Sequence, residues 1–234
     1  MTAAWARDGV AVVVGGTGGL GTAFAAHLRD AGAGRVVALG RTTEPPLDLT
    51  DEASVEAAAE CVGGPGGPVR LVIDATGVLH DDFARPEKTW RHLDPAALAR
   101  AFAVNATGPV LLMKHFLPLF PREGRAVFAT LSAKVGSIAD NRSGGWYAYR
   151  MSKAALNQGV RTAAHELHRR RPDALCVALH PGTVDTALSA PFAKQGLTVQ
   201  DPATAAQRLL AVLNTLTPAD SGGFFSYTGE ALPW

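Results

Sequence analysis

Tyr149 and Lys153 are the two residues whose types and spacing most clearly suit chemistry. They lie four positions apart in YAYRMSKAAL, so on a helix they share one face. A phenol with a pKa of about 10 is a weak acid-base catalyst at neutral pH, whereas a neighbouring ammonium group stabilises the phenolate and lowers that pKa. The pair therefore suits proton transfer, although the spacing taken alone also fits an ordinary amphipathic helix. Tyr147 points to another side of this helix and is expected to pack.

A glycine-rich loop precedes this pair and suits phosphate binding. Residues Gly15–Gly21 read GGTGGLG and lie between an apolar run, Val10–Val14, and a helical pattern. Glycines there allow close backbone approach, and the helix N-terminus can hold a pyrophosphate. The loop fits both G-x-G-x-x-G from Gly16 and G-x-x-x-G-x-G from Gly15, and a turn without a ligand is the other interpretation of the loop alone. Thr22 replaces the lysine of a Walker loop, which disfavours an ATPase.

Alternating strands and helices are predicted to position these residues. Strand patterns are short apolar runs at Val10–Val14, Arg35–Gly40, Arg70–Thr76, Arg125–Ser132, Ala174–His180 and Gly222–Gly229, with a further strand near Leu47. Helical patterns separate them at Thr22–Ala33, Asp51–Cys61, Pro95–Phe120, Tyr149 to about Arg171 and Ala203–Leu216. We therefore predict an α/β fold, a Rossmann-type doubly wound parallel sheet of about seven strands with helices on both faces. Residues 1–234 are expected to form a single domain, because glycine and proline cluster in turns.

Composition narrows the class of protein. The chain has 234 residues, of which 47% are hydrophobic and 18% charged, enough for a sizeable core and unlike a disordered tail or a fibre. Its 22 Lys and Arg against 21 Asp and Glu leave a formal charge of +1, so no broad field attracts nucleic acid or an anionic membrane. The expected partner is a small molecule.

Localisation and metal binding follow from what the sequence lacks. No apolar run reaches the roughly 18 residues that span a bilayer, and the N-terminus has no secretory signal pattern. Cys61 and Cys176 lie far apart, without metal-ligand spacing, which fits a reducing cytoplasm. No metal is expected, because no ligand set forms among the histidines His80, His115, His165 and His168.

The motifs together resemble the short-chain dehydrogenase/reductase family along essentially the whole chain. They occur in order as Gly15-x-x-x-Gly19-x-Gly21, DATG at Asp74–Gly77, Asn105, Ser132, Tyr149-x-x-x-Lys153 and HPGTVDT at His180–Thr186. More narrowly, SAKVGSIADNRSGGWYAY and the ending GGFFSYTGEALPW resemble the branch that includes the developmental C-factor proteins and the sniffer-type carbonyl reductases.

The resemblance implies a role for each motif. Tyr149 would be the general acid in carbonyl reduction, or the general base in alcohol oxidation, and Lys153 would lower its pKa and bind the nicotinamide ribose. Asn105 would hold a water in a proton relay, with a satisfied buried amide as the other interpretation, and Ser132 would complete the catalytic set. The cofactor would contact Gly15, Thr17, Gly19, Leu20, Gly21, Arg41, Asp48, Leu49, Ala75, Thr76, Gly77, Asn105, Tyr149, Lys153, Pro181, Gly182, Val184 and Thr186.

Three positions depart from the family pattern. Val14 replaces the Thr or Ser that braces the glycine loop, and DATG replaces N-N-A-G after the strand that ends near Asp74, which puts local rigidity in doubt. The usual Ser-x-x-Gly spacing would place the catalytic hydroxyl at Ala133, so Ser132 is preferred over Ser137.

The cofactor preference rests on the end of the second strand. An NAD site places a carboxylate there, about 20 residues past the loop, to bind the ribose 2'-hydroxyl. Here Gly40 leaves space, and Arg41 offers a guanidinium group to a 2'-phosphate. NADP(H) is therefore favoured over NAD(H), with Arg41 on a plain surface turn as the alternative.

The predicted function is an NADP(H)-dependent oxidoreductase that reduces a ketone or aldehyde, or oxidises the corresponding alcohol. The alternative is an NADP-binding regulatory or cell-signalling protein of C-factor type with weak or dispensable catalysis. A methyltransferase would leave Tyr149 and Lys153 unexplained. Ala187–Pro202, with Leu188, Phe192 and Leu197, is expected to form a lid over a modest apolar substrate. The family resemblance favours a homodimer or homotetramer.

Overall fold

The computed structural model describes residues 6–64, 66–81, 85–191, 196 and 198–234. Its main sheet has six parallel strands in the order β2-β1-β3-β4-β5-β8. The strands are β1 (Val10–Val14), β2 (Arg35–Leu39), β3 (Val69–Asp74), β4 (Ala126–Leu131), β5 (Ala174–His180) and β8 (Phe224–Ser226). The predicted α/β doubly wound sheet is confirmed, since the order reverses between β1 and β3.

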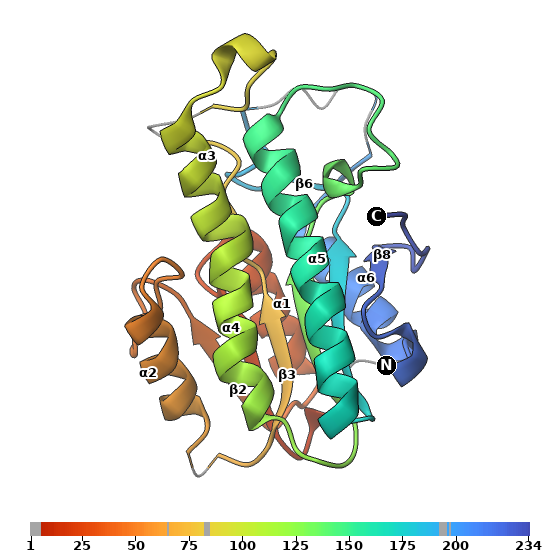
Figure 1. The fold of residues 1–234 in the computed structure, drawn as a ribbon. Helices are drawn as coiled ribbons and strands as arrows, with labels where there is room; N and C mark the ends of the chain where they lie inside the picture. Colours follow the sequence, from red (N-terminus) through yellow and green to blue (C-terminus); the bar gives the residue numbers. More distant parts are fainter. Residues whose placement is uncertain (1–5, 65, 82–84, 192–195, 197) are drawn as a thin grey trace.

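Helices cover both faces of this sheet. On one face α1 (Gly19–Asp30) and α6 (Pro202–Thr215) pack together, and their buried side chains form an apolar cluster with alternate residues of the strands. On the other face lie α2 (Glu52–Val62), α4 (Gly108–Phe116) and α5 (Tyr147–Arg170), and Figure 1 shows α4 and α5 side by side in front of the strands. The strands are apolar on both faces because both are buried.

The strand predicted near Leu47 does not form. Leu47 and Leu49 are buried in the core, but the segment between β2 and α2 has no pairing with the sheet. Pro45 and Pro46 lack the amide hydrogens that a ladder requires, and the Thr43 hydroxyl instead donates to the Pro45 carbonyl at 2.8 Å. Hydrophobic burial was thus predicted correctly, whereas strand pairing was not.

The helical region predicted from Pro95 to Phe120 is divided into segments. α3 (Pro95–Phe102) continues through a π-helical turn, η3 (Ala103–Thr107), into α4 and a short 3-10 turn, η4 (Leu117–Leu119). Within the described residues, Pro95–Leu119 is the one stretch long and apolar enough to cross a membrane by length and composition, with a mean hydropathy of 1.4. Its buried side chains Leu112, Met113 and Phe116 belong to the core below α5.

The carboxyl ends of the parallel strands meet at one edge of the sheet. Val14 pairs with Leu39 and Asp74, and Asp74 pairs with Thr130. Loops that leave these ends therefore converge, which is where ligands bind in open α/β sheets. A separate two-stranded piece, β6 (Thr183–Val184) with β7 (Val199–Gln200), lies beyond β5.

Candidate functional site

A cleft of about 1910 Å³, including its open mouth, lies at this edge of the sheet. About 730 Å³ of that space is accessible to water-sized molecules, which is within the roughly 300–1,000 Å³ typical of small-molecule and cofactor pockets. Predicted site residues that line it are Gly19, Leu20, Arg41, Ala75, Thr76, Gly77, Tyr149, Lys153, Pro181, Gly182, Val184 and Thr186. Gly15, Thr17, Gly21, Asp48, Leu49, Asn105 and Ser132 do not line it.

The glycine loop forms the cradle of the cleft. Gly15 has a φ of +76°, and its amide donates to the Leu39 carbonyl at 2.8 Å. A Cβ on Gly21 would lie 2.1 Å from the Gly15 carbonyl oxygen, so only glycine fits there. Thr22 donates its hydroxyl to the Gly16 carbonyl at 3.1 Å, which braces the turn that Val14 leaves without a hydroxyl. The loop therefore fits a pyrophosphate held at the start of α1.

Arg41, the predicted 2'-phosphate ligand, lines the cleft together with the glycine loop. Its side chain is exposed and lines the cleft beside Gly18 and Gly19. Asp48 does not reach the cleft, because its Oδ1 accepts hydrogen bonds from the Thr50 amide at 2.8 Å and hydroxyl at 2.7 Å. These bonds lower the pKa of Asp48. Arg41 is therefore the residue, among those predicted to bind the 2'-phosphate or the adenosine, whose side chain lines the cleft.

Tyr149 and Lys153 lie together on the cleft wall, one turn apart on α5. The Lys153 ammonium nitrogen is 6.0 Å from the centre of the Tyr149 ring, and it donates to the Leu131 carbonyl oxygen at 2.7 Å. Lys153 is only 3% exposed, whereas Tyr149 is half-buried. Tyr147 does not line the cleft, which agrees with its predicted packing role.

Burial shifts the two pKa values in opposite directions. Desolvation raises the pKa of Tyr149 to about 12, and it lowers the pKa of Lys153 to about 8, with the Asp74 carboxylate opposing the second shift. The predicted lowering of the Tyr149 pKa by the ammonium group is not found, because desolvation of the phenol dominates. At neutral pH the pair consists of a protonated phenol and an ammonium group.

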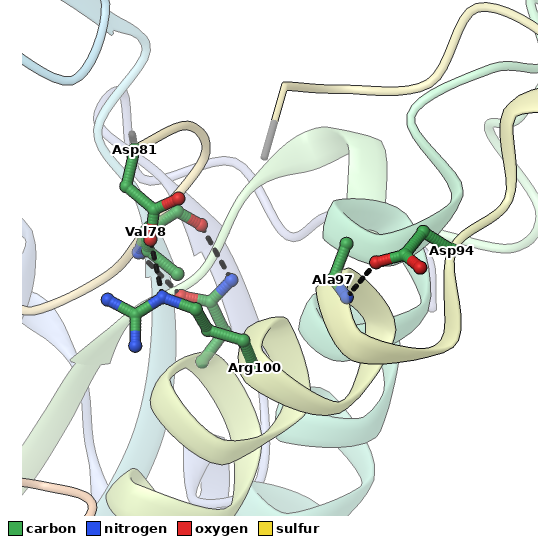
Figure 2. A network of polar contacts seen from close by, with 6 residues as sticks. Val78, Asp81, Asp94, Ala97 and Arg100 are labelled. Carbon is green, nitrogen blue, oxygen red and sulfur yellow. Dashed lines mark hydrogen bonds and ion pairs between the residues drawn. The ribbon is translucent and has the colours of Figure 1, made fainter. Parts of the chain in front are cut away.

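Asn105 is buried in the π-helical turn η3, where it ties two elements together. Its Oδ1 accepts from the Val78 amide and its Nδ2 donates to the Val78 carbonyl, both at 2.8 Å, and Nδ2 is also 3.1 Å from the Ser152 hydroxyl on α5. Figure 2 shows the neighbouring clamp, in which Arg100 of α3 contacts Asp81 of the same loop. Asp94 caps α3 by accepting from the Ala97 amide at 2.7 Å.

The serine region does not place a hydroxyl on the cleft wall. Ser132 is buried and donates to Asn157 Oδ1 at 2.6 Å, while Ser137 is buried and accepts from the Asp140 amide at 3.1 Å. The cleft is lined instead by Ala133, the position that the family spacing assigns to the catalytic hydroxyl. The structure therefore does not put Ser132 where the predicted catalytic role requires it, because its side chain faces α5.

The altered segment after β3 is held by hydrogen bonds despite its departure from the family pattern. The buried Asp74 carboxylate accepts from the Thr76 amide at 3.0 Å and from the Thr130 hydroxyl at 2.6 Å. A hydrogen-bonded carboxylate thus stands where the family pattern has side-chain amides, and it is close enough to Lys153 to raise the pKa of that lysine. These bonds join the segment after β3 to β4.

The loop after β5, which is predicted to contact the nicotinamide, lines the cleft. Pro181, Gly182 and Thr186 line the cleft, and the Pro181 carbonyl accepts from Gln200 Nε2 at 3.0 Å. Leu188 of the predicted lid also lines it, whereas Phe192 and Leu197 lie outside the described residues.

Several cleft residues were not assigned a site role from the sequence. They are Gly18, Leu79, Lys134, Val135, Trp146, His180, Thr183, Ala187 and Ser189, together with Ala133 and Leu131. The signal for Trp146 was the pair of glycines directly before it, three residues ahead of Tyr149. The His180 imidazole accepts from the Lys134 amide at 3.3 Å, and burial lowers the pKa of this histidine to about 4, so it is neutral.

Cysteine and histidine side chains give no second site. Cys61 is exposed and Cys176 is buried, and neither forms a disulfide. His165 and His168 are both exposed on α5, as predicted. In the part of the chain that the structure describes, no three His, Cys, Asp or Glu side chains are grouped as metal ligands.

Sequence comparisons place this geometry among known proteins. The model of the short chain dehydrogenase family matches residues 9–196. The chain is 38% identical to the C-signal of Myxococcus xanthus over 169 residues, covering 72% of this chain and 94% of that protein. It is 32% identical to the 1-hydroxy-2-glutathionyl-2-methyl-3-butene dehydrogenase of a Rhodococcus species, covering 95% of this chain and 98% of the relative.

Solved structures are also similar. The NADPH-bound carbonyl reductase from chicken fatty liver superposes with a TM-score of 0.84 at 26% identity, covering 97% of this chain and 99% of that chain. The Sniffer carbonyl reductase of Drosophila melanogaster has a TM-score of 0.81 at 23% identity, over 97% and 99% of the two chains, and supports the fold alone.

Proposed function

Because the chain belongs to the short-chain dehydrogenase/reductase family, we propose that it is an NADP(H)-dependent oxidoreductase that reduces a ketone or aldehyde. The observation that carries this proposal is the position of Tyr149 and Lys153 on the wall of a cleft whose other end is the glycine loop. The resemblance to the C-factor and sniffer-type branch agrees with the similarity to both groups of proteins.

Each residue of the pair has a distinct role in reduction. The bound cofactor would supply hydride to the substrate carbon. Tyr149 donates its phenolic proton to the carbonyl oxygen, and its pKa of about 12 keeps that proton in place at neutral pH. Lys153, still an ammonium group below its pKa of about 8, stabilises the phenolate that remains. The protonated phenol is the form that carbonyl reduction requires, and reduction is the direction that we propose.

Asn105 and Ser132 support this pair without lining the cleft. The Asn105 carbonyl oxygen lies beside Gly77 and fixes the loop after β3 through Val78, so we assign it the relay position near Lys153. Ser132 is proposed as a positioning residue, because its bond to Asn157 joins the end of β4 to α5. Neither role requires contact with the substrate.

The cofactor-binding residues fit a phosphorylated dinucleotide. The proposed contacts are the glycine loop for the pyrophosphate, Arg41 for the 2'-phosphate, and Pro181 to Thr186 for the nicotinamide. The chicken carbonyl reductase was solved with NADPH, which supports the same choice here. Asp48 and Leu49 do not line the cleft, so an adenine contact there would require the cofactor to approach the loop between β2 and α2.

A regulatory function is the second candidate, and two observations favour it. The Myxococcus relative is named C-signal, and the cleft carries Ala133 where a catalytic serine is usual. In this alternative the protein binds NADP without sustained turnover. Both candidate functions use the cleft, and they differ in whether Tyr149 and Lys153 catalyse repeated carbonyl reduction.

The remaining properties are proposed from the same family membership. We infer that residues 1–234 form one domain, that the protein is cytoplasmic, and that it assembles as a homodimer or homotetramer. The proposed partner is a small carbonyl or alcohol, with neither nucleic acid nor a membrane involved, in keeping with the formal charge of +1.

A panel of ketones and aldehydes tests the proposal directly. The purified protein is mixed with NADPH or NADH, and cofactor oxidation is followed by absorbance. Steady oxidation of NADPH by at least one carbonyl supports the enzyme. NADPH binding with at most one turnover per protein supports the regulatory alternative, and no binding of either cofactor contradicts both.

A further inference from the structure

The turn before Tyr149 holds a tryptophan in an unusual backbone conformation. Gly144, Gly145 and Trp146 have consecutive positive φ angles of 63°, 66° and 54°. Over the described ranges of the chain, Trp146 is the one residue other than glycine with a positive φ. A bulky residue adopts this conformation only where the surrounding structure enforces it, and such positions cluster at functional sites.

Arg150 enforces the turn from the first turn of α5. Its guanidinium nitrogens donate to the carbonyls of Gly145 at 3.0 Å, Gly144 at 3.3 Å and Val135 at 3.2 Å. One side chain therefore joins the turn to the loop after β4. Arginine suits this task because its planar fork presents several donors in fixed directions.

Glu87 secures the same turn from the opposite side. Its backbone carbonyl accepts from the Trp146 amide at 2.6 Å, and its buried carboxylate lies 3.3 Å from the Ala148 amide at the start of α5. A carboxylate at a helix N-terminus is also favoured by the helix dipole. The tryptophan backbone is thus fixed between two elements.

The fixed side chain faces the substrate half of the cleft. Trp146 lines the cleft, and its ring centre is 6.3 Å from that of Tyr149 with the ring planes at 70°, an edge-to-face arrangement. Leu79, Val135 and Leu188 line the same cleft and are half-buried. The indole ring of Trp146 therefore lies beside Tyr149, the proposed proton donor, and aliphatic side chains line the same part of the cleft.

We propose that Trp146 determines specificity for carbonyl compounds that carry an aromatic ring next to the carbonyl group. This inference rests on the proposed reductase function. A planar ring gains stacking or edge-to-face energy on the indole in addition to burial, whereas an aliphatic ring of the same size gains burial alone. Because the backbone of Trp146 is held by Glu87 before the substrate arrives, little ordering of this turn is required on binding.

Two aldehydes of nearly equal size provide the test, benzaldehyde and cyclohexanecarboxaldehyde. The ratio of their kcat/KM values with NADPH is measured for the wild type, Trp146→Leu, Trp146→Phe and Trp146→Gly. Trp146→Leu is expected to lower the benzaldehyde-to-cyclohexanecarboxaldehyde ratio by about 2- to 10-fold, the range for an aromatic pair, and Trp146→Phe is expected to retain most of it. Trp90→Leu is the matched control, because Trp90 is 67% exposed and lies away from the cleft.

Trp146→Gly keeps the test valid if leucine strains the turn, since glycine adopts a positive φ freely. It should lower the ratio as Trp146→Leu does. An unchanged ratio in both variants overturns the inference. If the ratio is unchanged because kcat/KM falls equally with both aldehydes, Trp146 only positions Tyr149. If the wild type oxidises NADPH with neither these aldehydes nor any other carbonyl, the proposed reductase function fails instead.

Discussion

At the scale of single residues, burial has more effect on the pKa values of Tyr149 and Lys153 than the distance between them. Tyr149 and Lys153 are adjacent on α5, yet desolvation raises the pKa of the phenol to about 12 and lowers that of the ammonium group to about 8. Asp74 is the charge that counteracts the second shift, and it is held by Thr76 and Thr130. A residue that does not line the cleft therefore helps to keep Lys153 charged.

Replacing the Asp74 carboxylate tests this electrostatic role. In Asp74→Asn the pKa of Lys153 is expected to fall below about 8, because the carboxylate that raises it is gone. The ammonium form is then lost at lower pH, so the alkaline limb of the kcat/KM profile for carbonyl reduction should move to lower pH. Glu60→Gln, an exposed carboxylate on α2, is the control and should leave the profile in place. A limb that does not move, in a variant that remains folded, would contradict the role.

The alanine at position 133 predicts a gain of function. Ala133 lines the cleft, so Ala133→Ser would present a hydroxyl to the substrate oxygen. A neutral hydrogen bond contributes about 0.5–1.5 kcal/mol, so kcat/KM should rise by roughly 2- to 10-fold. Ser132→Ala is the paired variant and should mainly lower the melting temperature, since its hydroxyl binds Asn157. If Ser132→Ala abolished turnover without changing stability, Ser132 would be catalytic after all.

At the scale of elements, sequence patterns predicted which segments are strands and helices wherever the pattern was regular. The five strands from Val10–Val14 to Ala174–His180 follow short apolar runs; four of them are buried on both faces, whereas the edge strand β2 is only partly buried. The strand near Leu47 is absent because apolar burial and strand pairing are separate requirements: Leu47 and Leu49 are buried, but the preceding Pro45 and Pro46 have no amide hydrogens for a strand ladder.

The direction of a side chain was harder to predict than its element. Ser132 was assigned to the end of a strand, and it lies directly after β4 as expected. Whether it faced the cleft or α5 depended on the register of β4 against β5, where the Ser132 amide donates to the Leu179 carbonyl at 2.8 Å. That register comes from tertiary packing, and the family spacing at Ala133 was the better guide.

The glycine loop gives an element-scale prediction. In Gly21→Ala the new Cβ would lie 2.1 Å from the Gly15 carbonyl oxygen, so α1 must move away from β1. Cofactor affinity is expected to fall at least 10-fold, with a lower melting temperature, because the amides at the helix start no longer converge. Gly64→Ala, where the nearest atom would be 3.6 Å away, is the control. NADPH affinity is measured for both variants by fluorescence titration. Unchanged affinity in Gly21→Ala would contradict the assignment of the loop.

At the scale of the whole molecule, the cleft joins segments from nearly the entire chain at one edge of the sheet. Arg41 at one end and Trp146 at the other line the same cleft although they are far apart in sequence. The order of the sequence motifs predicted the fold class and many of the residues that line the cleft. The substrate half, with Leu79 and Leu188, depends on how the loops pack and has no sequence motif. The sequence motifs therefore predicted the fold and much of the cleft lining, whereas they did not predict the side chains of the substrate half.

Cofactor choice is a property of the whole cleft and is tested at Arg41. Arg41→Ala should weaken NADPH binding by roughly 10- to 100-fold, the effect of losing a hydrogen-bonded charge, and should leave NADH binding nearly unchanged. Arg29→Ala serves as the control, because Arg29 is exposed on α1 and does not line the cleft. A wild type that prefers NADH, or a variant that loses both cofactors alike, would contradict the preference.

The central claim is that Tyr149 donates the proton to a carbonyl substrate, and removal of its hydroxyl tests this most directly. NADPH binding and NADPH oxidation are measured in the wild type and in Tyr149→Phe, with the best carbonyl from the panel, and with Tyr147→Phe as a control outside the cleft. We expect Tyr149→Phe to bind NADPH like the wild type and to lose at least 100-fold in kcat, in the range for general acid catalysis, while Tyr147→Phe keeps its activity. Near wild-type turnover in Tyr149→Phe would contradict the account.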